Sequence, residues 1–80
     1  MTREEIIAGL EAPGARRDVA AMYADAYLEY REASANISEQ GAMVLHPRTA
    51  NPIENPYLKI RDRAQAKLRT FRGINASWLW

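Results

Sequence analysis

A basic segment in the second half of the chain has the residue types and spacing needed to bind phosphate groups. Residues 57–72 contain one acid, Asp62, and six basic residues: Lys59, Arg61, Arg63, Lys67, Arg69 and Arg72. At about 100° per residue, three of the six line each flank of an apolar helical stripe. Such side chains contact the phosphates of a duplex and release its counterions. The segment therefore predicts DNA contacts through these six residues.

The charge distribution along the chain leaves a second interpretation of the basic segment open. Before Gly41 eight acids accompany four basic residues, and from Gly41 onward seven basic residues accompany two acids. In this interpretation the basic segment pairs with Asp25, Glu29 and Glu32 on a neighbouring helix. Exposed ion pairs contribute only about 0–1 kcal/mol each. The pattern alone does not decide between phosphate binding and internal pairing.

Candidate catalytic and metal-ligating residues are few. The chain has no cysteine and one histidine, His46, which stands beside Pro47. A structural zinc site needs four ligands of suitable type. The serines have no base near them in the sequence, and the four glycines stand apart instead of forming a phosphate-binding loop. We therefore expect no catalytic residue, metal, cofactor or small-molecule substrate, and a protein that is not an enzyme.

The residue pattern predicts a single all-α domain over residues 1–80. We expect a short docking helix at 1–14, capped by Thr2, and a long helix at 15–41 that ends at Gly41. A connector at 42–55 follows, with an extended stretch at residues 43–45, and its prolines exclude a helix and disfavour a central strand. The basic helix at 56–73 starts from an Asn55-Pro56 cap, and 74–80 form an aromatic tail. The expected architecture is an antiparallel helical hairpin with a short N-terminal helix and a long proline-containing connector.

Apolar spacing predicts which residues form the core or an oligomer interface. Residues on the long helix follow alternating steps of four and three, as in a heptad repeat, and a second face of small residues lies opposite. We expect a helix contacted from both sides, and tyrosines that belong to the core and do not stack on bases. A chain of 80 residues buries a small core, so we expect a homo-oligomer. The predicted core and interface residues are Val19, Tyr23, Ala26, Leu28, Tyr30, Ile37, Ile60, Leu68 and Phe71.

The aromatic tail and the hydropathy of the chain bear on partners. Trp78, Leu79 and Trp80 are predicted to bind a partner, although the two indoles could equally pack back onto the hairpin. No apolar run approaches the roughly 20 residues needed to cross a bilayer. The first five residues do not resemble a secretory leader. We expect no membrane partner and an intracellular protein.

Four segments together resemble the small subunits of phage terminases, which are DNA-packaging proteins. These segments are the acidic, tyrosine-containing helix at residues 23–33, the Gly-plus-extended stretch at 39–45, the Asn-Pro helix start at 55–61 and the helix end at 71–74. The resemblance covers residues 19–74. Similar small subunits serve phage-like gene transfer agents. The chain has no room for a separate helix-turn-helix domain, which favours DNA binding with little sequence preference.

The resemblance implies a non-catalytic subunit in the cytoplasm of a host bacterium. It implies a ring of copies that binds double-stranded DNA, delivers it to the large ATPase and nuclease subunit, and regulates that enzyme. The alternative from a different class is a helical protein–protein interaction module with no nucleic-acid role. In that case the basic helix would pair internally with the acidic one.

Overall fold

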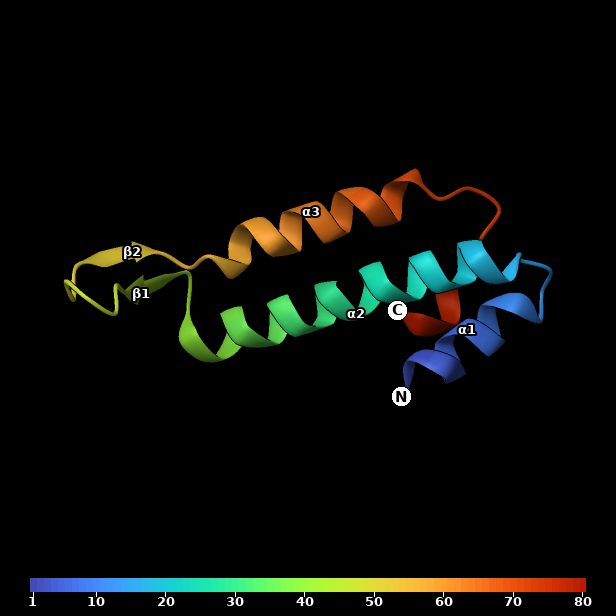
Figure 1. Ribbon diagram of the computed structural model, residues 1–80, viewed down its shortest axis with the longest axis horizontal. Coiled ribbons are helices and arrows are strands. Elements are labelled where there is room, and N and C mark those ends of the chain that lie inside the picture. Colours follow the sequence, from blue (N-terminus) through green and yellow to red (C-terminus); the bar gives the residue numbers. More distant parts are fainter.

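Two long antiparallel helices form the body of the protein in the computed structural model, which describes residues 1–80 (Figure 1). Helix α2 spans Arg17–Gln40 and helix α3 spans Tyr57–Thr70, and they pack side by side over most of the length of α3. Gly41 ends α2 with a positive φ of 87°, a conformation that glycine adopts without strain. The molecule is elongated, with extents of 50 × 23 × 19 Å.

Helix α1, Arg3–Glu11, packs against the face of α2 that does not meet α3. Thr2 and Glu5 form a reciprocal capping box, each accepting the other's backbone N–H at 3.2 Å, as predicted for Thr2. Ile6, Ile7 and Leu10 are completely buried. Burial of such a side chain contributes about 1.5–3 kcal/mol, which explains how a nine-residue helix stays docked.

The prediction of an α2 contacted from both sides is confirmed, but both neighbours belong to the same chain. Helices α1 and α3 cover the two faces that the sequence suggested for building an oligomer. Of the predicted core and interface residues, Tyr23, Ala26 and Leu68 are buried, and Leu28, Tyr30 and Phe71 pack half-buried against the same core. The other three, Val19, Ile37 and Ile60, are half-buried. Self-association therefore needs surfaces other than the two covered faces of α2.

The connector contains a β-hairpin, so the all-α prediction is correct for the helices and wrong for this segment. Strands β1, Met43–Leu45, and β2, Pro52–Glu54, pair antiparallel, with Val44 opposite Ile53 at the centre. Pro52 occupies the first position of its strand, where a missing N–H is tolerated because every strand of a two-stranded sheet is an edge. The hairpin projects from the end of the helical pair (Figure 1).

Asn55 joins the hairpin to both long helices. Its side-chain amide donates to Asn36 Oδ1 at 3.0 Å and to the Gly41 carbonyl at 2.9 Å. Its Oδ1 accepts the N–H of Tyr57 at 3.0 Å, which is the predicted capping role at the start of α3. Asn55 is the one buried polar residue, and each of these polar atoms has a partner.

Candidate nucleic-acid interface on the third helix

The basic side chains on α3 are largely free of ion pairs. Lys59, Arg63, Lys67 and Arg69 are exposed and take part in no salt bridge. Arg61 is half-buried, and its Nε lies 3.9 Å from the carboxylate of the adjacent Asp62. Five predicted DNA-binding residues thus stand on one helix with their positive charge available to an external anion.

Arg72 does not belong to this helix, contrary to the predicted range of 56–73. Helix α3 ends at Thr70, and Phe71 is extended with φ −77° and ψ 130°. Phe71 packs edge-to-face against Tyr23, with ring centroids 5.4 Å apart. This contact forms where the chain leaves the helical path. Arg72 follows this bend and is exposed, so it extends the basic surface beyond the last turn of α3.

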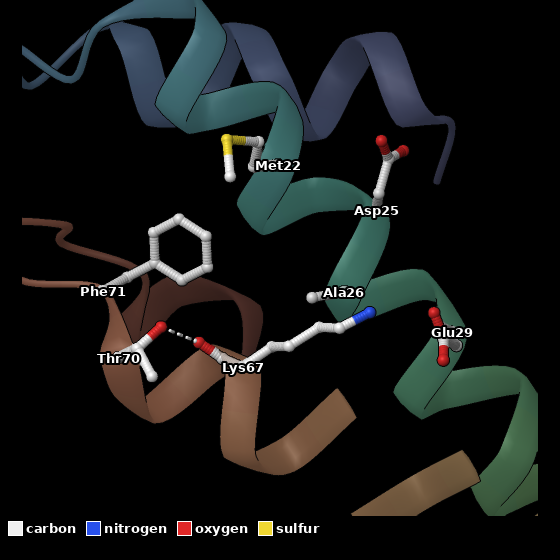
Figure 2. Close-up of a pocket in the computed structure, with 7 residues that line it drawn as sticks. All are labelled: Met22, Asp25, Ala26, Glu29, Lys67, Thr70 and Phe71. Atoms are coloured by element: carbon white, nitrogen blue, oxygen red, sulfur yellow. Dashed lines mark hydrogen bonds between the residues drawn. The ribbon is translucent and has the colours of Figure 1, made fainter. Parts of the chain in front are cut away.

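Lys67 differs from its neighbours because its side chain crosses toward α2. It lines a cleft of about 370 Å³ between the two helices, and Asp25 and Glu29 stand on the opposite wall (Figure 2). The ammonium group reaches over Ala26 without forming an ion pair with either carboxylate. Lys67 therefore differs from the other basic residues of α3 in facing two carboxylates of α2.

Lys59 and Arg63 lie on the same flank nearer the start of α3. They line a second cavity of about 410 Å³ with Glu54, Asn55 and Ile60. Three basic residues spaced four apart, the third being Lys67, thus follow one flank of the helix, while Arg61 and Arg69 follow the other. The arrangement suits an extended polyanion, because no group of side chains here encloses a small molecule.

The internal pairing that the sequence left open does not form. Asp25 pairs with Arg3 of α1, where the Nε to Oδ1 distance is 2.6 Å, and this hydrogen bond holds the pKa of Asp25 below its usual range. Glu29 and Glu32 make no salt bridge. The acidic half of the chain is instead linked to the basic residues of its own half, and no ion pair joins α2 to α3.

A second such pairing ties α1 to the start of α2. Arg17 holds Glu4 at 3.1 Å and Glu11 at 3.0 Å. Both carboxylates raise the pKa of Arg17, with the hydrogen bond to Glu4 as the largest cause. Arg17 therefore clamps the two ends of α1 and contributes no free charge to the basic surface.

The aromatic tail packs back onto the helices while keeping much of both indoles exposed. The Trp80 indole N–H donates to the Tyr23 hydroxyl at 3.1 Å, and its ring lies edge-to-face with Tyr27 and Tyr30 at 5.0 and 5.3 Å. The exposed fractions are 47% for Trp78 and 62% for Trp80. The tail therefore combines an internal anchor with an exposed aromatic surface.

Leu79 must be removed from the predicted partner-binding set because its side chain is buried within the chain. It lies in the short 3-10 turn Ser77–Leu79, and its carbonyl accepts the Tyr27 hydroxyl at 2.8 Å. Sequence reasoning missed this role of Tyr27, which also accepts a hydrogen bond from Arg31. It also missed Gly9, which lies under the Trp78 ring. The available signal was a glycine inside a helix, where a close neighbour often explains its presence.

Neither a metal-ligating cluster nor a membrane-spanning helix is found in the structure. No group of three or more metal-ligating side chains could hold an ion. None of the helices combines the length and apolar character of a bilayer-crossing segment.

The chain matches a known protein family. A family model described as "Phage terminase, small subunit" matches residues 4–73, a range that covers α2, the β-hairpin, α3 and all of α1 except its first residue. No curated protein and no solved structure matches the chain significantly. The family match confirms the resemblance that the sequence motifs carry, and the aromatic tail at residues 74–80 lies outside the matched range.

Proposed function

Because the chain belongs to the small subunits of phage terminases, we propose that it binds double-stranded DNA with low sequence specificity and delivers it to the large subunit during packaging. The family supports a role in phage DNA packaging. The chain would act without catalysis of its own and would regulate the ATPase and nuclease of the large subunit. Self-association into a ring would gather several copies of α3 on one duplex.

The basic row on α3 is the observation that carries this proposal. None of its cations forms an ion pair with a carboxylate of α2, although α2 packs alongside α3 and contains several acids. Contacts from such side chains to phosphates carry little sequence information. Weak contacts repeated around an assembly become strong through effective concentration. A polyanion of regular charge spacing is therefore the partner that this row fits.

Salt dependence of DNA binding tests the proposal. For a duplex of arbitrary sequence, the logarithm of the binding constant should fall linearly with the logarithm of the salt concentration. The slope should lose about 0.9 for each phosphate contact removed. Arg63→Gln and Arg69→Gln should each reduce the slope by that amount for every copy that contacts the duplex. Fluorescence anisotropy with a labelled duplex measures both the binding constant and the slope.

A matched control separates local contacts from overall charge. Arg16→Gln removes the same charge from an exposed arginine at the start of α2, far from α3 in the sequence. We expect the slope of this variant to equal that of the wild type. Binding by the wild type that ignores salt, or an equal loss for all three variants, would contradict contacts through α3.

We further propose that the exposed indole surface of Trp78 and Trp80 contacts the large subunit. Tryptophan is enriched among the residues that dominate binding energy at protein interfaces, and both rings remain accessible while anchored. Trp78→Ala should reduce stimulation of the large-subunit ATPase and leave DNA affinity unchanged. A Trp78→Ala variant that stimulates the ATPase as well as the wild type would refute this contact.

A further inference from the structure

The cleft between α2 and α3 has an apolar floor that the Lys67 side chain crosses but that is otherwise open. Met22, Ala26 and Phe71 form that floor, and Met22 remains 61% exposed (Figure 2). Asp25 and Glu29 border it on the α2 side. Glu29 makes no salt bridge, whereas Asp25 is paired with Arg3, and the Lys67 ammonium lines the same cleft without an ion pair. Glu29 is therefore the rim carboxylate that remains open to a cation from outside the chain.

The β-hairpin carries a complementary surface at the other end of the molecule. Met43 and Leu45 are 58% and 65% exposed. Alternation along a strand places both on one face of the ribbon, with Pro52 opposite Leu45. The half-buried Val44 and Ile53 occupy the other face. Arg48, in the turn between the strands, is exposed and makes no salt bridge.

An exposed apolar face on a projecting two-stranded ribbon favours packing against another apolar surface. A ribbon of two three-residue strands is marginally stable without packing. The hairpin projects beyond one end of the helical pair (Figure 1), whereas the cleft is lined by residues 22–29 of α2 and 67–71 at the other end of α3. The hairpin of one chain therefore does not reach the cleft of that chain. A second copy of the same chain carries both the hairpin face and the cleft, so each surface has a matching surface on a neighbouring copy.

We propose that the β-hairpin of one copy docks into the α2–α3 cleft of the next copy. Leu45 and Met43 would cover Met22 and Phe71, and Arg48 would meet the carboxylates at the rim of the cleft. The inference rests on the proposed function, which requires self-association, and adds the surfaces through which copies meet. Two different surfaces make a head-to-tail contact, and such contacts close into rings when the rotation between copies allows it.

Mixing two variants tests the head-to-tail contact directly. Leu45→Glu places a charge on the apolar face of the hairpin and leaves the cleft unchanged. Met22→Glu places a charge in the cleft and leaves the hairpin unchanged. Each variant alone should be monomeric by native mass spectrometry. Their equimolar mixture should form a one-to-one dimer and stop there, since a single productive contact remains. Both residues are exposed, so circular dichroism should report unchanged helix content.

Charge exchange provides an independent test of the polar contact. Arg48→Glu should shift the assembly toward monomer because it places a carboxylate against the rim of the cleft. Adding Glu29→Arg to the same chain should restore the wild-type mass, since opposite charges again face each other. Ala12→Glu, an exposed substitution at the end of α1, serves as the control and should leave the assembly intact.

The outcomes separate this inference from the proposed function. An oligomeric wild type whose mass survives Leu45→Glu or Met22→Glu overturns the hairpin contact and leaves DNA delivery by an assembly standing. A wild-type mass of two copies indicates a reciprocal pair and overturns the head-to-tail arrangement. A mixture that stays monomeric, or an Ala12→Glu control that dissociates, also overturns it. A wild type that is monomeric with and without DNA removes the ring from both proposals, while the salt titration still reports on α3.

Discussion

Replacement of Gly9 by alanine should reveal whether the aromatic tail rests on α1. A Cβ added at Gly9 would lie 2.5 Å from both Cη2 and Cζ2 of Trp78, a distance at which the indole must move. In an ordinary helix the same substitution stabilises, because alanine exceeds glycine in helix propensity by about 1 kcal/mol. The two effects have opposite signs, so the sign of the measured change identifies the dominant one.

The magnitude follows from the area that Trp78 covers. A tryptophan in a core buries roughly 150–250 Å², and Trp78 keeps 47% of its surface exposed. About 100 Å² of burial at about 25 cal/mol per Å² corresponds to about 2.5 kcal/mol, an upper value. Subtracting the helix gain leaves a net destabilisation of about 1–2 kcal/mol if the ring loses most of this contact.

A double-mutant cycle isolates the contact. Urea unfolding at one fixed protein concentration should show Gly9→Ala lowering the free energy of unfolding in the wild-type background. In a Trp78→Ala background the steric conflict is gone, and Gly9→Ala should then raise the free energy of unfolding by about 0.5–1 kcal/mol. Stabilisation by Gly9→Ala in both backgrounds would refute the packing of Trp78 on α1.

Two further predictions concern Asn55 and Asp25. Asn55→Ala should lower the free energy of unfolding by about 2–4 kcal/mol in urea titrations, because the half-buried groups of Asn36, Gly41 and Tyr57 lose their hydrogen bonds to it. The exposed Asn51→Ala should have little effect, and equal losses for the two variants would argue against the network. The lowered pKa of Asp25 means that its pairing with Arg3 stabilises the fold above the pKa of an unfolded aspartate and is lost as the pH falls through the depressed value. Asp25→Asn should therefore flatten the decline in stability as the pH falls from the usual pKa of an aspartate through the depressed pKa of Asp25. An unchanged acid profile would contradict the pairing.

The helices could be predicted from the sequence because their signals are local. A heptad spacing of apolar residues assigns the face of α2 that meets α3, and Gly41 marks the end of α2 as expected. The capping box at Thr2 depends on residues three positions apart. Each of these signals lies within one or two helical turns, so no knowledge of distant contacts is needed.

The β-hairpin and the tail depend on contacts between distant residues. The hairpin forms because Val44 and Ile53 face each other across a turn, and three-residue strands give too short an alternation to recognise beside several prolines. The Trp80 indole finds the Tyr23 hydroxyl 57 positions away. The six basic residues of the candidate site could be named from the sequence. The ion pair of Asp25 could not, because it depends on how α1 packs against α2.

Helix α1 explains how a chain of nearly zero net charge keeps a basic surface free. Its Arg3 pairs with Asp25, one of the two α2 carboxylates on the wall facing Lys67, and its Glu4 and Glu11 pair with Arg17. Helix α1 thereby takes part in the ion pairs of three of the eight acids in the first half, namely Glu4, Glu11 and Asp25. The cations of α3 are left to an external polyanion, while Glu29 is left to a second copy. A loss of α1 docking should therefore weaken DNA binding indirectly, because it frees Asp25 to compete with phosphate for Lys67.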